Sequence, residues 1–277
     1  PPKVSIGMPV YNGEATIGEA LDSLLAQTFT DFELIISDNA SIDGTEAICR
    51  EYAARDARIR YVRQVENHGA PANFQFVLDE AVGEYFMWAA ADDIKSTDYI
   101  KENHRFLEAN YDYVASVSPV RFQGGEFDGV RMGDFSLDDE NFDLRMLNFF
   151  TKWHANGRYY SLIRRSALLG LSFGKLDYLG FDWMVVLHLL SQGKIKRIKK
   201  GHVILDTNGE SNTTNIFSKY NNKSFLYFIF PFKDLIIDFH RNYPKAIKRQ
   251  RIHLYLKWLI LSYQALKLNI IFAVRGR

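Results

Sequence analysis

The sequence predicts an α/β fold in which a mainly parallel sheet is flanked by helices. Short apolar runs of strand length alternate with segments of helical periodicity that are roughly 10–15 residues long. This alternation is typical of βαβ units, whose parallel strands are covered by helices on both faces. The composition, 47% apolar and 24% charged, is ordinary for a folded protein and excludes a disordered chain, a collagen and a coiled coil.

The first half of the chain contains strands and helices in alternation. Val4–Met8 alternates apolar and small residues before Pro9, and Phe32–Ser37 is short and apolar enough for a buried strand. Asp43 and Glu46 have the spacing of a capping box, which opens a helix. The expected strands cover residues 4–8, 32–37, 59–62, 84–90 and 113–122, and the expected helices cover residues 17–25, 43–55, 73–82 and 97–110.

The second half is less regular. Residues 124–143 are rich in Gly and Asp and read as a long loop over the edge of the domain. Residues 181–190 read as a helix, and residues 195–198 and 203–205 read as short strands that pair with each other. A polar loop is expected at 207–214, followed from residue 217 by aromatic helices that are interrupted by Pro231 and Pro244.

The charge distribution divides the chain. Residues 1–189 hold 17 Lys and Arg against 29 Asp and Glu, whereas residues 190–277 hold 17 against 4, so the two parts face different partners. The single cysteine, Cys49, excludes a disulfide framework and a cysteine-built zinc site, fits a reducing compartment and reads as inert core. We see no targeting signal, and the most apolar segment, Trp258–Val274, is broken by Lys267 before it reaches the length of a membrane span.

Polar residues follow three of the expected strands, at Pro9–Asn12, Asp38–Asn39 and Asp92–Asp93. Parallel sheets bind ligands at the carboxyl ends of their strands. Each segment by itself could be an ordinary polar loop. Three of them on one edge, two with acidic residues, favour a shared site.

The adjacent carboxylates of Asp92 and Asp93 repel each other and are costly to bury. A bound Mg²⁺ or Mn²⁺ removes this cost and leaves coordination positions for phosphate oxygens. The alternative is that both residues cap the next helix. Asp38 is placed to accept a hydrogen bond from a ring N–H of a nucleobase, or to form an Asx turn.

Together these segments resemble the opening of family-2 glycosyltransferases. The resemblance is ordered over residues 3–98 and looser to about residue 215. The motifs that carry it are Pro9-Val10-Tyr11-Asn12-Gly13-Glu14, Gln27-Thr28, Glu33 to Thr45, Asn67-His68-Gly69, and Gly83-Glu84-Tyr85 before Asp92-Asp93.

The resemblance implies a GT-A fold and the transfer of a sugar, with inversion, from a nucleotide donor that is usually a UDP-sugar. It places Pro9, Val10, Tyr11 and Glu14 around the nucleoside. It also places Asp38 at the base, Asn67 near it, and Asp92 and Asp93 at the ribose and the divalent metal, Mn²⁺ or Mg²⁺. The chain departs from the pattern at Ala90, where the family often has an Asp, and at Ala72, where it often has an Arg. The division of roles between Asp92 and Asp93 therefore stays open.

Gly180-Phe181-Asp182-Trp183 resembles the family's Glu-Asp motif, with Phe181 in place of the Glu. The resemblance makes Asp182 the catalytic base, and its apolar neighbours would raise its pKa toward a useful basicity. The alternative is that Asp182 caps the helix that follows. His154 and Trp183 are candidates for the acceptor side.

Residues 216–277 carry 12 Lys and Arg against 2 Asp and Glu, interleaved with aromatic residues. This combination suits an anionic membrane surface. Alternatively, these helices pack on the first domain or on a second subunit of a homo-oligomer. No nucleic-acid-binding motif is present, so we expect no nucleic-acid partner.

We therefore expect a GT-A domain at 1–215, with a nucleotide-sugar half at 1–98 and an acceptor half at 99–215, and a helical basic extension at 216–277. The expected activity is inverting transfer from a nucleotide sugar to a glycan or lipid-linked acceptor in cell-surface polysaccharide synthesis. The expected location is cytoplasmic, peripheral on the inner face of the membrane. The alternatives are a non-catalytic nucleotide-sugar binding protein and a metal-dependent nucleotidyltransferase, which would release pyrophosphate.

Overall fold

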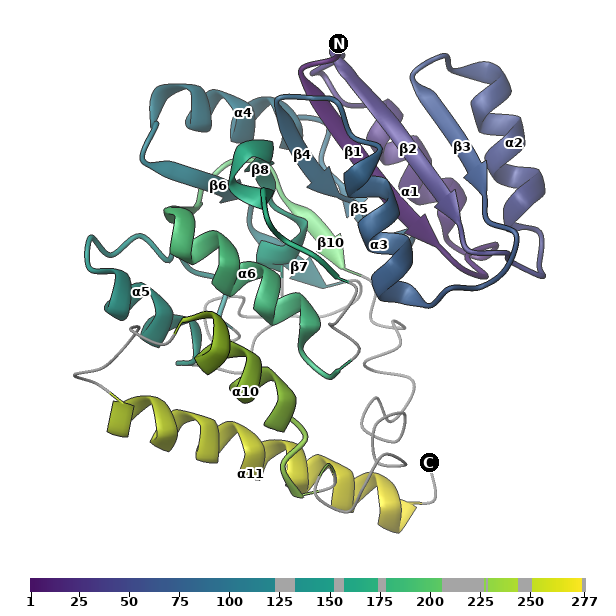
Figure 1. Cartoon of the computed structure of the whole chain (residues 1–277). Coiled ribbons are helices and arrows are strands. Elements are labelled where there is room, and N and C mark those ends of the chain that lie inside the picture. The colour runs from purple at the N-terminus through teal and green to yellow at the C-terminus, as the bar shows by residue number, and fades with distance from the viewer. Residues whose placement is uncertain are drawn as a thin grey trace.

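The computed structural model describes residues 1–122, 133–151, 157–173, 178–205, 227, 229–243 and 251–275. Its centre is a seven-stranded sheet in the order β3-β2-β1-β4-β8-β6-β9 (Figure 1). The strands are β1 Val4–Val10, β2 Phe32–Asp38, β3 Ile59–Arg63, β4 Tyr85–Trp88, β6 Tyr113–Val117, β8 Leu162–Arg164 and β9 Lys194–Arg197. All neighbours in this sheet pair in parallel except β8, which is antiparallel to both β4 and β6. The predicted α/β fold with a mainly parallel sheet is confirmed.

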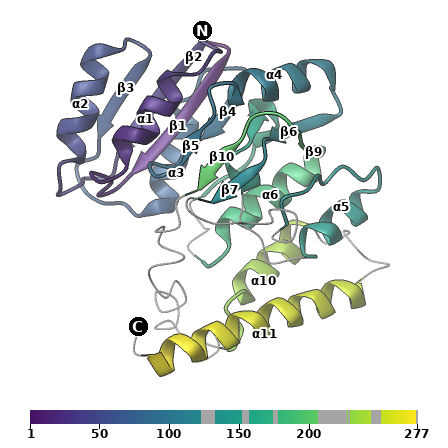
Figure 2. The same ribbon diagram turned by 180° about the vertical axis from the view of Figure 1, so that it is seen from behind.

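Helices cover both faces of the sheet, because the strands alternate apolar side chains between them. Even-numbered residues of β1 and β2 face α1 (Ile17–Leu25), α2 (Thr45–Arg55) and α4 (Tyr99–Ala109), as Figure 2 shows from behind. The opposite face carries α3 (Ala70–Asp79) and α6 (Phe181–Gln192). Helix α3 lies so close to β1 that a Cβ at Gly7 would come within 2.6 Å of Val77 Cγ2.

A second sheet of three short strands, in the order β5-β10-β7, lies beside the first. The strands are β5 Ile94–Lys95, β7 Val120–Phe122 and β10 Val203–Leu205. The expected strand 113–122 is therefore two strands, β6 and β7, which belong to different sheets. The expected pairing of 195–198 with 203–205 is wrong, because β9 pairs with β6 and β10 pairs with β5 and β7.

Two local expectations are corrected by tertiary contacts. The helix expected at 73–82 begins at Ala70 and has a proline in its first turn. The capping box is absent, since the N-cap of α2 is Gly44 and Asp43 Oδ1 accepts from Thr45 N at 3.0 Å, only two residues on. Glu46 pairs with Arg50 and Arg63 instead of reaching back to the N-cap.

The expected long loop at 124–143 is described only from residue 133. Leu137 forms a bridge to Ile195, and α5 (Phe142–Phe149) begins after Asn141, whose side chain accepts from Leu144 N at 3.1 Å. The expected loop at 207–214 lies outside the described residues. Two short 3₁₀ helices, Gly157–Tyr160 and Arg165–Leu168, flank β8.

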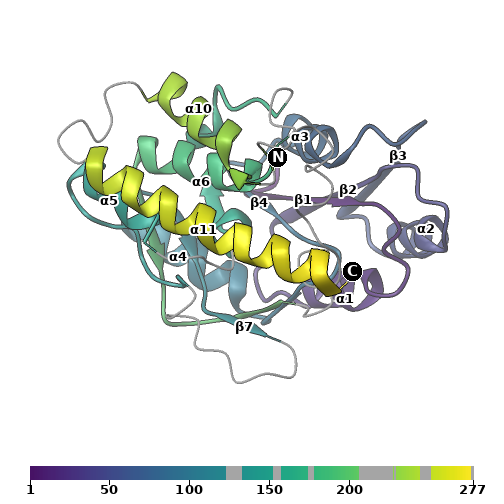
Figure 3. The same cartoon turned by 90° about the horizontal axis from the view of Figure 1, so that it is seen from below.

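The last two helices, α10 (Lys233–Asn242) and α11 (Arg251–Arg275), form a layer on the α5 and α6 side of the molecule (Figure 3). Phe150, Phe239 and Trp258 join this layer to the rest, with ring centroids 5.7–5.9 Å apart. The expectation that this region packs on the preceding domain is confirmed for one face of each helix. Among the described residues, no helix is both long and apolar enough to cross a membrane.

Candidate functional site

The carboxyl ends of β1, β2 and β4 meet at one edge of the sheet, since these strands run in parallel. Val10, the last residue of β1, pairs with Asp38, the last residue of β2. Asp92 and Asp93 follow β4, which is the other neighbour of β1. The three polar segments that the sequence singled out therefore lie at the same edge.

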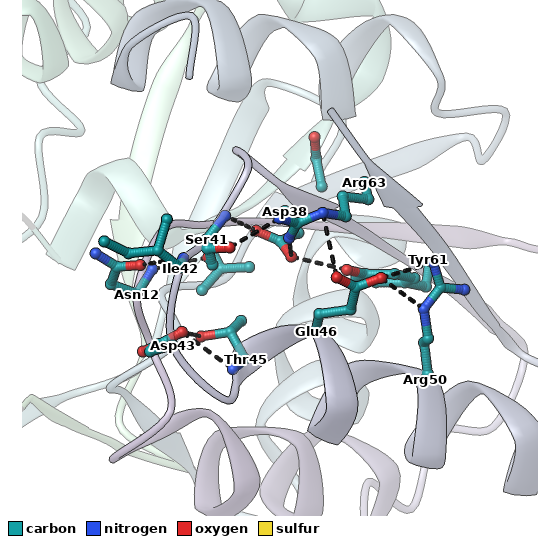
Figure 4. Close-up of polar contacts among 12 residues, drawn as sticks. Asn12, Asp38, Ser41, Ile42, Asp43, Thr45, Glu46, Arg50, Tyr61 and Arg63 are labelled. Atoms are coloured by element: carbon teal, nitrogen blue, oxygen red, sulfur yellow. Dashed lines mark hydrogen bonds and ion pairs between the residues drawn. The ribbon is translucent and has the colours of Figure 1, made fainter. Parts of the chain in front are cut away.

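The loops after β1 and β2 are tied together by hydrogen bonds between backbone and side chains. Two of these bonds lie at the left of Figure 4, where Asn12 N donates to Ser41 Oγ at 2.8 Å and Ile42 N donates to Asn12 Oδ1 at 2.9 Å. The others join Gly13 N to Thr45 Oγ1, Glu14 N to Asp43 Oδ2, and Gly44 N to Glu14 Oε2. These ties hold the two loops in one fixed arrangement.

Ala40, in the loop after β2, has a φ of 61°, in the left-handed region that costs a residue with a Cβ about 1–2 kcal/mol. The neighbouring Asn39 fixes its surroundings, because its side chain donates to Asn67 Oδ1 at 2.8 Å and accepts from His68 N at 3.0 Å. Backbone strain of this kind persists where neighbouring contacts over-determine the chain, and it is concentrated at functional sites.

Asp38 is fully buried and held by three protein donors. Ser41 N donates to Oδ1 at 2.8 Å, while Tyr61 Oη and Arg63 donate to Oδ2 at 2.7 and 2.9 Å (Figure 4). The Ser41 bond is the Asx-type turn that was the alternative for Asp38. Both carboxylate oxygens of Asp38 thus already accept hydrogen bonds from the protein. Contact of Asp38 with a nucleobase stays a prediction.

Tyr61 and Arg63 were missed by the sequence analysis. They stand two apart on β3, so both side chains leave the strand on the same side and reach Asp38 on the neighbouring strand. Burial and the bond to Asp38 raise the pKa of Tyr61 well above its ordinary value. The sequence signal that could have indicated them is the two-residue spacing of Tyr61 and Arg63 on the strand next to the one that ends at Asp38.

The other candidates for the nucleoside pocket differ in exposure. Pro9 and Val10 are buried at the end of β1, whereas Tyr11 is 47% exposed. Glu14 and Asn67 are exposed, and Asn67 Oδ1 also accepts from Gly69 N at 2.9 Å. Tyr11, Glu14 and Asn67 are thus the members of this set with accessible surface.

Asp93 is buried and Asp92 partly buried in the segment between β4 and β5. Helix α4 begins at Tyr99, with Asp98 at its N-cap. The alternative that Asp92 and Asp93 cap the next helix is therefore wrong. The pair instead lies at the sheet edge, next to the loop after β1.

Asp182 comes to the same place from a different part of the chain. The pKa of Tyr160 is raised well above its ordinary value by burial and by the charges of Asp93, Asp92 and Asp182. All three carboxylates therefore lie within electrostatic reach of one phenol. Tyr160 was also missed, because nothing in its local sequence distinguishes it from a core aromatic residue.

Asp182 lies in the first turn of α6, after Gly180 at the N-cap. Its carboxylate is favoured there by the helix dipole. Phe181, which stands where the family motif has a Glu, packs against Phe74, Tyr159 and Phe173, with ring centroids 6.1–6.2 Å apart. This aromatic cluster fixes the start of α6 at the sheet edge.

The two acceptor-side candidates are not both placed. Trp183 is buried and stacks on Phe232 of the α10 segment at 5.1 Å, so its ring would have to leave this stack to contact an acceptor. His154 lies outside the described residues.

The described part of the chain contains no group of three or more His, Cys, Asp or Glu residues placed to hold a metal ion. This agrees with the chemistry of Mg²⁺ and Mn²⁺ in nucleotide sites, where one or two carboxylates and the phosphates of the substrate share the ion. Asp92 and Asp93 fit that requirement.

The family model described as glycosyl transferase family 2 matches residues 5–170. The chain belongs to this family. Among curated relatives of this chain, the minor teichoic acid biosynthesis protein GgaB of Bacillus subtilis is 25% identical over 266 residues, 93% of this chain. Glycosyltransferase GlyA of Streptococcus pneumoniae is 33% identical over 99 residues, 36% of this chain. The matched regions span only 28% of GgaB and 14% of GlyA.

Solved structures show the same fold. The mannosyltransferase PcManGT of Pyrobaculum calidifontis, in complex with GDP-Man and Mn²⁺, matches with a TM-score of 0.65 at 16% identity, over 99% of this chain and 79% of that one. Residues 1–349 of TarS from S. aureus, in complex with UDP-GlcNAc, match with a TM-score of 0.58 at 19% identity, over 74% of this chain and 58% of that one. The expected GT-A fold is confirmed.

Proposed function

We propose that this glycosyltransferase moves a sugar, with inversion, from a nucleoside-diphosphate donor to a hydroxyl group of a glycan or lipid-linked acceptor in cell-surface polysaccharide synthesis. The observation that carries the proposal is that Asp92 and Asp93 follow β4 at the sheet edge that holds the Asp38 loop, and that the charges of Asp92, Asp93 and Asp182 all act on Tyr160. Neighbours solved with UDP-GlcNAc and with GDP-Man support a nucleotide-sugar donor, and we favour a UDP-sugar. GgaB supports a cell-wall polymer as the product.

In this proposal the donor nucleoside lies on the tied loops after β1 and β2, against Tyr11 and Asn67. Asp92 and Asp93 hold the ribose and a divalent cation, which supplies Lewis-acid stabilisation of the leaving diphosphate when bound. Asp182 accepts the proton of the acceptor hydroxyl while that oxygen bonds to the anomeric carbon. The bond from that carbon to the diphosphate oxygen breaks on the opposite side, so the configuration inverts.

The same proposal places the enzyme on the cytoplasmic face of a membrane through α11. One side of this helix is buried and carries Leu254, Leu261 and Ala265. The other side exposes large apolar residues with exposed fractions of 48–68%, namely Leu256, Leu259, Ile260, Tyr263 and Ile270. We call this set the α11 face.

An anionic bilayer suits the α11 face better than a second copy of the same helix. After Asp238 the chain holds nine Lys and Arg and no Asp or Glu, so two such helices would repel each other. Basic helices with an apolar face bind the surface of anionic bilayers. The domain limits, 1–215 and 216–277, remain a prediction. The formation of a homo-oligomer also remains a prediction.

A panel of nucleotide sugars tests the donor proposal. Each is added to the protein with Mn²⁺, and the melting temperature is compared with that in EDTA. The donor should raise the melting temperature, because it binds only the folded form, and EDTA should reduce the shift. Release of UDP on addition of an acceptor would identify the transferase. Binding without release would indicate a non-catalytic binding protein, and pyrophosphate release from a nucleoside triphosphate would indicate a nucleotidyltransferase.

A further inference from the structure

A cavity of about 480 Å³ lies between α6 and α10. The two helices lie side by side in Figures 1 and 3, and residues 170–172 also line the space between them. A volume of this size is within the range that small-ligand sites occupy. We call this space the α6–α10 cavity.

The side of α6 that lines the cavity is not the side that carries Asp182. Met184, His188 and Ser191 follow one another at spacings of four and three residues, so they lie on one side of the helix. Asp182 stands two residues before Met184, and residues two apart on a helix do not share a side. Gln192, which also lines the cavity, is about 15 Å from Asp182 along the helix axis, because each residue adds about 1.5 Å. The cavity is therefore separate from the position of the proposed base.

Several polar atoms at the cavity have unused capacity for hydrogen bonds. His188 Nε2 is buried and has no hydrogen-bond partner among the residues that the structure describes. The side-chain amide nitrogens of Gln192 and Asn242 donate within the protein, to Ser191 Oγ at 3.0 Å and to Asp238 O at 2.9 Å. This use of the amide nitrogens leaves the two side-chain carbonyl oxygens to accept hydrogen bonds from a ligand.

The charged groups at the cavity compensate each other. Arg241 Nη1 donates to Asp238 Oδ1 at 3.0 Å, and this ion pair holds all the formal charge of the described lining residues. Burial lowers the pKa of His188, so its imidazole is neutral at pH 7. The cavity therefore offers no net charge to an ion. The other N–H groups of the Arg241 guanidinium can donate to a neutral ligand.

Apolar side chains supply the rest of the lining. They are Leu171, Met184 and Tyr243, and the Tyr243 ring packs against Phe239 with centroids 5.5 Å apart. A ligand that suits this lining has groups that both donate and accept hydrogen bonds, together with C–H surface and no charge. Sugar residues have these properties, because each hydroxyl group donates and accepts while the ring presents C–H groups on its faces.

We propose that the α6–α10 cavity binds a neutral sugar residue of a glycan chain, at a site separate from the site of transfer. The site goes beyond the proposed function and depends on neither the donor nor the base assigned there. Because α6 carries Asp182 at its start and lines the cavity farther along, a glycan bound in the cavity is held close to the site of transfer. Such a site would retain the glycan on the enzyme between two transfers.

The test is binding of the full chain, labelled at its N-terminus with a fluorophore, to an array of immobilised neutral and acidic oligosaccharides in EDTA and without a nucleotide sugar. The double variant Gln192→Ala and Asn242→Ala removes two exposed amides at the cavity, and His188→Phe removes the imidazole but keeps a ring. Each variant should bind the neutral oligosaccharides that the wild type binds about tenfold more weakly, as loss of one or two hydrogen bonds implies. Lys101→Ala, at an exposed position on α4, is the control and should bind like the wild type.

Four results would overturn the inference. They are a wild-type protein that binds no oligosaccharide, binding of acidic oligosaccharides only, wild-type affinity in the double variant, and a loss of binding in Asp182→Asn that the cavity variants do not share. The exposed positions of Gln192 and Asn242 keep the test valid if His188→Phe does not fold. Nucleotide-sugar binding with Mn²⁺ should be unchanged in the double variant, so failure of the donor proposal and failure of this inference are distinguished.

Discussion

The proposed donor side and the proposed acceptor side of the site are held by different interactions. On the donor side, hydrogen bonds join the loops after β1 and β2, and Asp38 is held by Ser41, Tyr61 and Arg63. On the acceptor side, Asp182 is carried by a helix whose start is fixed by the aromatic contacts of Phe181. Hydrogen bonds impose direction, whereas apolar packing mainly imposes volume. Hydrogen bonds therefore fix the loops after β1 and β2 in direction, while aromatic packing contributes to holding the start of α6.

The largest effect is expected on the acceptor side. Asp182→Asn removes the proposed base and should lower transfer by about 10²–10⁴-fold while donor binding is retained. Transfer is followed by UDP release, and donor binding by calorimetry. The melting temperature is measured alongside to show that the variant is folded. A variant that transfers sugar at the wild-type rate would falsify the assignment of the base.

On the proposed donor side, removal of the Asp38 carboxylate should lower the stability of the protein. Asp38→Ala leaves Arg63 and Tyr61 without their buried acceptor and should lower the free energy of unfolding by about 3 kcal/mol. Urea unfolding followed by circular dichroism measures this. Asp31→Ala, at an exposed position just before β2, is the control and should change stability by less than about 0.5 kcal/mol. Equal losses in the two variants would contradict the role given to Asp38.

The third prediction concerns the α11 face, which lies on the helical layer of α10 and α11 next to α6. The double variant Leu259→Glu and Tyr263→Glu should weaken binding to phosphatidylglycerol vesicles by at least about tenfold, because two exposed apolar contacts are lost and negative charge is added. Co-sedimentation measures this, with phosphatidylcholine vesicles as the uncharged reference.

The control for the α11 face is Ile42→Glu together with Val65→Glu, which changes two residues that are 84% and 95% exposed on the donor side. This variant should bind the vesicles like the wild type. A wild-type protein that ignores the vesicles and forms dimers through α11 would instead support the interface between copies.

The smallest effect concerns His188 of α6. Burial lowers its pKa below the ordinary value of 6.5, so the folded protein favours neutral imidazole. The unfolded chain binds the proton more readily, and the stabilising contribution, fully present above pH 6.5, is lost as the pH falls below it. His188→Gln should therefore reduce the loss of stability between pH 7.5 and 5.5 by up to about 1 kcal/mol. Parallel pH dependence of the two proteins, measured by urea midpoints, would contradict this.

Local patterns were sufficient for most of the elements. Alternation in Val4–Met8 predicted β1, a short apolar run predicted β2, helical spacing predicted α1 and a longer apolar run predicted α6. These signals depend on which residues are apolar and not on their partners. The prediction that Cys49 is inert core agrees with its complete burial, which, with the charges of Asp38 and Asp43, raises its pKa to about 12. The shared edge of Asp38 and Asp92–Asp93 followed from parallel pairing alone.

The remaining features depend on contacts between distant segments. Residues 195–198 and 203–205 are near in sequence, yet each pairs with strands 80 to 110 residues earlier in the chain. Tyr160 looks like an ordinary aromatic residue until the fold brings it within electrostatic reach of Asp93 and Asp182. The sequence by itself determined the family, the strand-end acids and the basic end of the chain, because these are properties of composition and spacing. Only the tertiary structure decided which carboxylates share a neighbour, because burial and electrostatic reach arise when separate segments pack together.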